Sequence, residues 1–200
     1  MNSFGKSWLA LAGFCIVASA SYADNGGKQP VKNIMDMGTV PAKLDAKLQK
    51  AFPAPSRSEV QTAAAPGLTY LQVDYVVSTN YYMQYPTTLG YEGLSNSQSM
   101  TTGDHGGAQL WVVTDELGYG DNPVATWNGG QISLATNFAT QTICVNWART
   151  GYDIPCQAGQ TVVGFRKYWD FSGYQSGIFT YQNQSTNSPF NTMFDSMSIK

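Results

Sequence analysis

Histidine is the scarcest of the residues that commonly carry catalysis, since His105 is the only one in the 200-residue chain. A zinc site built from three histidines is therefore excluded. Any mechanism that needs a histidine as acid or base has to use His105. The chain also lacks a phosphate-binding loop, a dinucleotide fingerprint, a nucleophile elbow and a CxxC motif. The sequence thus contains no strong motif of a known enzyme class.

Charge is also scarce, because ionisable Asp, Glu, Lys and Arg residues make up only 12% of the chain. Residues 67–200 contain four basic and nine acidic residues, a net charge of −5, whereas residues 24–66 have a net charge of +2. Nucleic acids and anionic membranes are bound mainly through clustered lysines and arginines. The composition of residues 67–200 therefore excludes a nucleic acid as partner.

No hydrophobic run reaches the ~20 residues that a helix needs to span a bilayer, so we expect no integral membrane span in the mature protein. The apolar run over residues 8–20 follows Lys6 and ends in Ser21-Tyr22-Ala23. This order of a positive residue, an apolar run and a small-residue cleavage site is typical of a signal peptide. We predict that residues 1–23 are cleaved and that the protein is secreted, to the periplasm or the exterior.

Cysteine is nearly absent after the predicted cleavage site, where only Cys144 and Cys156 remain. Two cysteines in an oxidising compartment usually pair. We therefore predict one structural disulfide that closes a loop of 13 residues. Closing such a loop restricts the unfolded chain and stabilises the fold by roughly 3 kcal/mol.

Residues 24–66 contain five prolines, which is typical of a linker or a pro-segment. Within this segment Leu44, Leu48 and Phe52 recur at every fourth position. This spacing indicates one apolar stripe of a possible short amphipathic helix. The pattern leaves open whether the segment is a plain linker, docks on the domain or is removed.

Beyond residue 66 the pattern changes to short stretches rich in β-branched and aromatic residues, separated by turn signals. We expect strands over residues 68–77, 109–114, 131–138, 140–148, 160–171, 177–182 and 193–199. No helix is expected in this part of the chain. The pattern predicts an all-β fold, a compact antiparallel β-sandwich or barrel over residues 67–200.

His105 lies in the stretch Gly103-Asp104-His105-Gly106-Gly107, which the glycines predict to be a flexible loop. We name His105 and Asp104 as the candidate catalytic residues. The alternative interpretation is a structural histidine whose ring caps a backbone group in a turn.

A second candidate site is acidic. Asp115, Glu116 and Asp121 lie within seven positions of a predicted turn. Carboxylate oxygens are the ligands that calcium prefers, so calcium is the one cofactor that the sequence suggests. The spacing does not match an EF-hand loop, and turns are rich in aspartate for other reasons. A pair of these carboxylates is also compatible with a glycosidase mechanism.

Aromatic residues are abundant, with four tryptophans, eleven tyrosines and six phenylalanines in residues 67–200. Aromatic faces stack on sugar rings and anchor protein interfaces. The candidate ligand-binding residues are Tyr81, Tyr82, Tyr85 and Trp127, and the stretch from Tyr81 to Tyr85 is expected to be a loop. Trp147 and Trp169 lie on apolar strand faces and are expected in the core. The alternative is that the β core uses most of the aromatic residues.

Five short stretches resemble a secreted bacterial family of the YolA type. They are Leu68-Thr69-Tyr70-Leu71-Gln72-Val73, Asp104-His105-Gly106-Gly107, Glu116-Leu117-Gly118-Tyr119-Gly120, Phe179-Thr180-Tyr181-Gln182-Asn183 and Asn191-Thr192-Met193. The resemblance implies a signal peptide followed by one small domain over residues 67–200. It also implies that the loop around His105 is a shared feature of the fold. It implies no activity and no catalytic residues.

Three functions are compatible with these patterns. The leading hypothesis is a secreted binding module whose aromatic loops recognise a glycan, a cell-wall component or a protein surface. The second is a secreted hydrolase that uses His105 with Asp104 or nearby carboxylates. The third is a secreted toxin or antagonist that residues 24–66 mask until they are removed.

Overall fold

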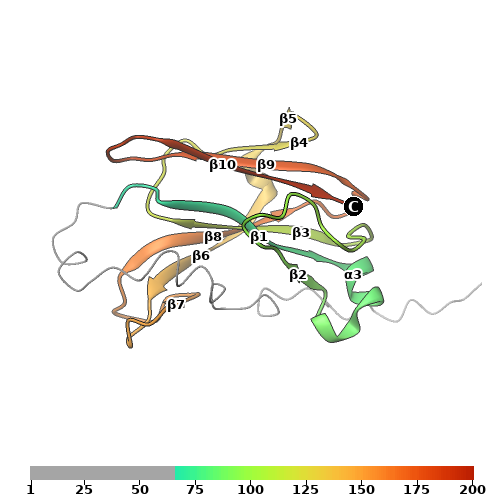
Figure 1. The fold of residues 1–200 in the computed structure, drawn as a ribbon, viewed down its shortest axis with the longest axis horizontal. Helices are drawn as coiled ribbons and strands as arrows, with labels where there is room; N and C mark the ends of the chain where they lie inside the picture. The colour runs from blue at the N-terminus through green and yellow to red at the C-terminus, as the bar shows by residue number, and fades with distance from the viewer. Residues whose placement is uncertain (1–65) are drawn as a thin grey trace, which may run out of the picture. The chain divides into compact units, whose positions relative to one another are not determined.

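The structure is a computed structural model that describes residues 66–200. The predicted signal peptide over residues 1–23 and the predicted linker up to residue 65 lie outside the described residues. Residues 66–200 form a sandwich of two antiparallel sheets, which Figure 1 shows as two layers. The prediction of an all-β fold is therefore confirmed.

The larger sheet has six strands in the order β2-β1-β3-β8-β6-β7. Their bounds are Tyr91–Gly93 for β2, Tyr70–Ser78 for β1, Leu110–Leu117 for β3, Val162–Asp170 for β8, Asn137–Val145 for β6 and Tyr152–Asp153 for β7. The smaller sheet has four strands in the order β10-β9-β4-β5. Their bounds are Thr192–Ile199 for β10, Gly177–Gln184 for β9, Val124–Trp127 for β4 and Gly130–Gln131 for β5. The helical turns are α3 (Thr79–Gln84), η2 (Pro86–Thr88) and η3 (Leu134–Thr136).

The helix α3 corrects the expectation that the segment after β1 is a loop. Ser78 has an extended backbone, and its hydroxyl accepts the N–H of Tyr81 at 3.1 Å. This N-cap satisfies one of the free N–H groups of the first helical turn. The serine before the tyrosines is the sequence signal for this helix.

The prediction of a strand over residues 131–138 is also wrong. The hydroxyl of Ser133 accepts the N–H of Ala135 at 3.2 Å and begins the helical turn η3. Short polar side chains that bond to nearby backbone in this way compete with strand formation. β6 therefore begins only at Asn137. The short strands β2, β4, β5 and β7 were not predicted, and the other six predicted strands are present with slightly shifted bounds.

The main core lies between the two sheets and is dominated by aromatic side chains. Trp169, Phe179 and Tyr181 are almost fully buried, and the ring of Trp169 lies 5.8 Å from that of Phe179 and 5.1 Å from that of Tyr181, between centroids. The Trp169 indole N–H donates to the hydroxyl of Thr114 at 3.0 Å, so its one polar group is satisfied. Burial of aromatic side chains supplies much of the stability of a domain of this size. The prediction that Trp169 is a core residue is confirmed.

Trp147 was also expected in the core, and this prediction is wrong. The strand β6 ends at Val145, and 65% of the Trp147 side chain is exposed. The predicted disulfide between Cys144 and Cys156 is present. Trp147 lies in the loop that this disulfide closes. Apolar alternation continues past the end of the strand in the sequence, and the turn that stops the strand is decided by the tertiary fold.

Three polar side chains surround the Glu116 carboxylate between the sheets. Lys167 donates to the Glu116 carboxylate at 2.5 Å, and Asn183 donates to its other oxygen at 3.0 Å. The Tyr181 hydroxyl donates to Glu116 and accepts from Lys167. A buried carboxylate is tolerated when it is paired and hydrogen-bonded in this way. This network binds β3 and β8 of the larger sheet to β9 of the smaller one.

The other face of the larger sheet buries a second polar network. Arg166 donates to both oxygens of Asp115 at 2.6 and 2.7 Å, a bidentate pair that is fully buried. The Tyr70 hydroxyl donates to Asp74 at 2.7 Å. Burial raises the pKa of the Asp74 carboxyl well above its usual range, and the neighbouring negative charge of Asp115 raises it further. Tyr70 and Arg166 offset only part of this shift.

These surroundings favour the protonated form of the Asp74 carboxyl more strongly in the folded protein than in the unfolded chain. Within the described residues, the buried atom Oδ2 of Asp74 has no hydrogen-bond partner. An acceptor without a donor is costly in a buried site. A proton on Asp74 turns this oxygen into a donor that can reach the neighbouring Asp115.

We predict that Asp74 makes the fold less stable as the pH rises. A carboxyl group whose pKa is raised on folding stabilises the folded state. This contribution is complete below the unfolded pKa of ~3.9 and is lost as the pH rises through the folded pKa. The expected slope is about 1.4 kcal/mol per pH unit for one proton. Asp74→Asn should remove this slope and raise the free energy of unfolding at pH 7, measured by urea titration from pH 4 to 8.

The matched control is Asp121→Asn, because Asp121 is an exposed aspartate outside both networks. It should leave the slope unchanged. An Asp74→Asn variant that is less stable than the wild type at pH 7 contradicts the assignment of a proton to Asp74.

Candidate functional site

His105 lies in an irregular segment before β3, as the sequence predicted, but its side chain is fully buried at one end of the sandwich. The segment before it is bound to the end of β10. The N–H of Thr101 donates to the Ser198 carbonyl at 2.9 Å, and the N–H of His105 donates to the Lys200 carbonyl at 2.7 Å. The backbone pairing holds His105 in place from a strand that is far away in the sequence.

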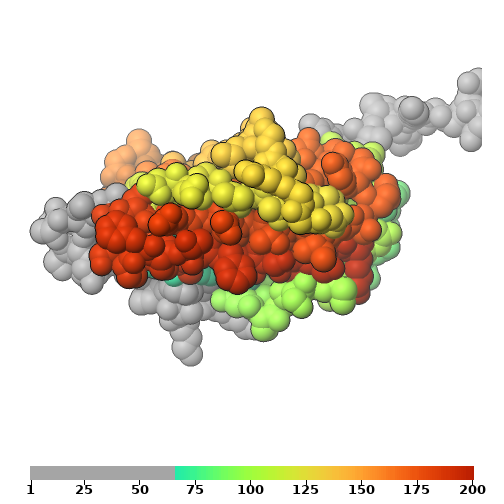
Figure 2. All heavy atoms as spheres, turned by 90° about the horizontal axis from the view of Figure 1, so that it is seen from above, coloured from blue at the N-terminus to red at the C-terminus, as the bar shows by residue number. Residues whose placement is uncertain are grey.

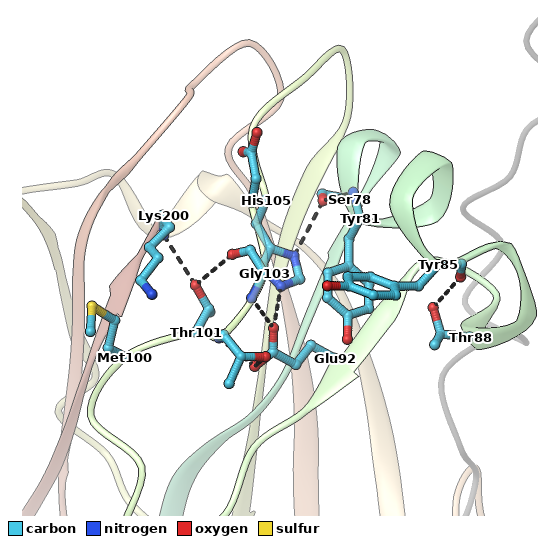
Figure 3. A network of polar contacts seen from close by, with 12 residues as sticks. Ser78, Tyr81, Tyr85, Thr88, Glu92, Met100, Thr101, Gly103, His105 and Lys200 are labelled. Atoms are coloured by element: carbon cyan, nitrogen blue, oxygen red, sulfur yellow. Dashed lines mark hydrogen bonds and ion pairs between the residues drawn. The ribbon is translucent and has the colours of Figure 1, made fainter.

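Both ring nitrogens of His105 have partners (Figure 3). Nε2 lies 2.8 Å from a carboxylate oxygen of Glu92, and Nδ1 lies 3.2 Å from the hydroxyl of Ser78. The ring of Tyr81 stacks on the imidazole with 4.5 Å between centroids and an angle of 7° between the planes. We call Ser78, Glu92, His105 and Tyr81 the histidine network.

The partners assign the hydrogens of this network. A carboxylate only accepts, so Nε2 of His105 donates to Glu92. In the neutral imidazole, Nδ1 then accepts the hydroxyl proton of Ser78. The Ser78 oxygen in turn accepts the N–H of Tyr81. The Glu92 carboxylate, both ring nitrogens of His105, the Ser78 hydroxyl and the Tyr81 N–H are thus all hydrogen-bonded within the protein.

Glu92 receives more donors than His105 alone. The N–H and hydroxyl of Thr102 donate to it at 2.8 and 2.9 Å, and the N–H of Gly103 donates at 3.1 Å. Burial alone raises the pKa of Glu92, but the hydrogen bonds from His105, Thr102 and Gly103 outweigh it and lower the pKa to about 2. Glu92 is therefore ionised under all ordinary conditions.

Gly103 is required by the close packing of the network. A Cβ atom at this position would lie 2.4 Å from the ring of Tyr81. Only glycine lets the backbone pass beneath this ring and present its N–H to Glu92.

Asp104, the second predicted catalytic residue, does not contact the imidazole. Its carboxylate accepts the N–H of Gly106 at 3.0 Å and lies 3.4 Å from the amide of Asn80. The partner of His105 is Glu92, which the sequence analysis missed. The two residues lie 13 positions apart along the chain. Glu92 reaches the ring of His105 because β2 lies beside β1.

The four aromatic residues that were predicted to bind a ligand differ in how much of each side chain is exposed. Tyr81 is buried in the histidine network, Tyr82 is half-buried, and Tyr85 is 47% exposed. The ring of Tyr85 packs against Tyr81 with 4.8 Å between centroids. Trp127, the fourth predicted ligand-binding residue, is buried and stacks on Phe171 with 4.2 Å between ring centroids.

Two other exposed apolar side chains lie within four positions of Tyr85 along the chain. Met83 of α3 is 66% exposed, and Leu89, directly after η2, is 52% exposed. We call Met83, Tyr85 and Leu89 the aromatic corner. The histidine network supports this corner from below, through the stack of His105, Tyr81 and Tyr85 (Figure 3).

The predicted calcium ligands do not come together. Asp115 and Glu116 are neighbours in β3, so their side chains point to opposite faces of the sheet. Both are buried and paired with cations, whereas Asp121 is exposed. Among residues 66–200, no group of three or more His, Cys, Asp or Glu side chains is placed to hold a metal ion. The same part of the chain contains no helix that is long and apolar enough to cross a membrane.

The fold and the site define a disulfide-bonded all-β sandwich with a buried, fully hydrogen-bonded histidine. The chain belongs to the family described as a domain of unknown function, DUF4879, whose profile matches residues 55–199. Both sheets and the histidine network lie within the matched range. No curated protein matches the chain.

We predict that Glu92→Gln destabilises the domain by about 2 kcal/mol at pH 7, because the charge-assisted hydrogen bonds to the carboxylate are lost. Glu92 has a pKa that is lowered on folding. Its stabilising contribution is therefore present above the unfolded value and lost as the pH falls toward about 2. The difference between wild type and variant, measured by urea unfolding, should shrink as the pH falls from 5 to 2.

Asp104→Asn is the matched control, since Asp104 is exposed and close to the network without contacting the ring. It should change the free energy of unfolding by less than about 0.5 kcal/mol. Equal losses in both variants are incompatible with Glu92 as the partner of His105.

Proposed function

We propose that the protein is a secreted bacterial binding module of the YolA type, and that the aromatic corner contacts its ligand. The ligand is a glycan, a cell-wall component or a protein surface. The disulfide between Cys144 and Cys156 fits an oxidising compartment. The family assignment carries no activity, so the proposal depends on the site alone.

The observation that carries the proposal is the exposed ring of Tyr85 on a buried support. Tyr85 packs on Tyr81, and Tyr81 packs on His105, whose two nitrogens are both held. An aromatic side chain fixed in this way loses little conformational entropy on binding. Met83 adds a flexible apolar contact beside it, as adaptable binding surfaces often do.

The state of His105 favours binding over catalysis. A general base has to reach a substrate proton, directly or through one water molecule. His105 is fully buried, and its nitrogens already bond to Glu92 and Ser78. The network then has a positioning role for the aromatic corner.

We predict that Tyr85→Ala weakens binding by about tenfold or more, because the variant loses the supported aromatic contact. The measurement is retention of the full chain on soluble and insoluble glycans, on cell-wall sacculi and on whole cells. His105→Gln should weaken binding less than Tyr85→Ala, since it only loosens the support.

Tyr174→Ala is the control, because Tyr174 is another half-exposed tyrosine whose ring packs on Trp127 and Phe171 rather than on Tyr81. It should leave retention unchanged. Full retention by Tyr85→Ala, or an equal loss in the control, rules out the aromatic corner as the contact surface.

A hydrolase is the second candidate, and one observation favours it. Ser78, His105 and Glu92 form a row in which a hydroxyl donates to an imidazole and the imidazole donates to a carboxylate. A nucleophile, a base and an orienting acid have this order in serine hydrolases. The burial of Ser78 counts against this function, since a substrate reaches the hydroxyl only if α3 moves.

The hydrolase hypothesis predicts that the full chain cleaves p-nitrophenyl esters and that Ser78→Ala or His105→Gln lowers the rate by about 10⁴-fold. Asp104→Asn should keep the activity. Equal rates in the wild type and both variants exclude a hydrolase at this site. The third hypothesis, masking by residues 24–66, involves the part of the chain outside the described residues and stays a prediction.

A further inference from the structure

The outer face of the smaller sheet is uncharged along its four strands. Phe179, Tyr181 and Met197 point into the core, so the residues between them point outward. Figure 2 views this face from above, with β10 and β9 in red and orange and β4 and β5 in yellow. Within the described residues, no outward position of these four strands carries an ionisable side chain.

The outward residues form rows across the strands. The central row contains Ser196, Thr180, Thr126 and Gln131, which the register places side by side on β10, β9, β4 and β5. The hydroxyls of Thr180 and Ser196 lie 2.9 Å apart and bond to each other. Strands lie ~4.8 Å apart, so this row of hydroxyls and one amide spans roughly 14 Å.

One large apolar side chain lies on each side of the central row. Phe194 pairs with Gln182 in the row on one side, and Ile178 pairs with Ser198 in the row on the other. Phe194 is 71% exposed and Ile178 is 51% exposed. We call Thr126, Thr180, Gln182, Ser196, Phe194 and Ile178 the neutral face.

The exposed aspartates Asp104, Asp121 and Asp170 all lie outside these four strands, so the face differs from the surfaces that carry the charge of the domain. Solvent-facing sheets usually carry charged residues, which keep them soluble and prevent association. A charged side chain pressed against an uncharged partner loses hydration without gaining a counter-charge. A face made only of hydroxyls, amides and apolar groups is therefore suited to an uncharged partner.

We propose that the neutral face binds an uncharged polysaccharide. The hydroxyls and amides of the central row can each donate and accept hydrogen bonds, as the hydroxyls of a sugar chain do. Phe194 and Ile178 supply apolar contacts for the C–H faces of sugar rings on either side of this row. A second copy of the chain is a poorer occupant, because homodimer interfaces are more apolar than a face with two large apolar residues.

This site is separate from the aromatic corner, and the two proposals can fail independently. The corner is formed by α3 and η2 at the edge of the larger sheet, whereas the neutral face belongs to the smaller sheet (Figure 1). Tyr85→Ala changes only the first surface, and substitutions at Thr180 change only the second.

The experiment measures retention of the full chain on insoluble cellulose, chitin and starch, with Thr180→Lys and Thr180→Glu as variants. We expect the wild type to bind at least one of these polymers and both variants to bind about tenfold more weakly, since either charge is desolvated without compensation. Carboxymethylation of the bound polymer should weaken wild-type retention as well.

The controls are Thr161→Lys and Thr161→Glu, because Thr161 is an exposed threonine just before β8 and outside the neutral face. They should bind like the wild type. If Thr180→Lys does not fold, judged by its melting transition, Gln182→Lys takes its place, with the exposed Gln157→Lys as its control.

Three results overturn the proposal. The first is a wild type that no uncharged polymer retains. The second is opposite effects of the two charges, such as stronger binding by Thr180→Lys and weaker binding by Thr180→Glu, which indicate a charged partner. The third is a wild-type dimer in sedimentation that Thr180→Lys dissociates, which makes the neutral face an interface between two copies.

Discussion

The hydrogen bond between His105 and Glu92 joins parts of the chain that otherwise share no regular structure. Glu92 belongs to the edge strand β2, and His105 follows a segment that pairs with the end of β10. Ser78, at the end of β1, completes the row and begins the helix α3. One ionised, buried carboxylate thus connects an edge of the larger sheet, the end of the smaller sheet and the helix that presents Tyr85.

The two sheets depend on a similar use of buried charge. β3 and β8 are buried on both faces, so each face has to accommodate the polar residues of these strands. Glu116 and Lys167 are paired between the sheets, and Asp115 and Arg166 are paired on the opposite face. Buried pairs of this kind contribute little net stability, but breaking one leaves an uncompensated charge. They therefore favour this particular register of β3 against β8.

The exposed surfaces divide into two chemistries that suggest different contacts. The aromatic corner is apolar and small, and the buried histidine network holds its central ring. The neutral face is broad, uncharged and rich in hydroxyls, and its rows follow directly from the strand register. The loop with Trp147 adds an exposed aromatic at a third place, in the segment that the disulfide closes.

The sequence by itself determined the all-β class, six of the strands and the disulfide, because alternation, turn residues and cysteine count are local properties. It also named His105, Tyr81 and Tyr85, since rare and aromatic residues are visible in composition. Only the tertiary structure decided their roles: Glu92 rather than the adjacent Asp104 bonds to His105, Tyr85 is exposed, and Trp127 is buried. The physical reason is that exposure and side-chain pairing depend on which strands lie side by side, and strand order is set by packing across the whole domain.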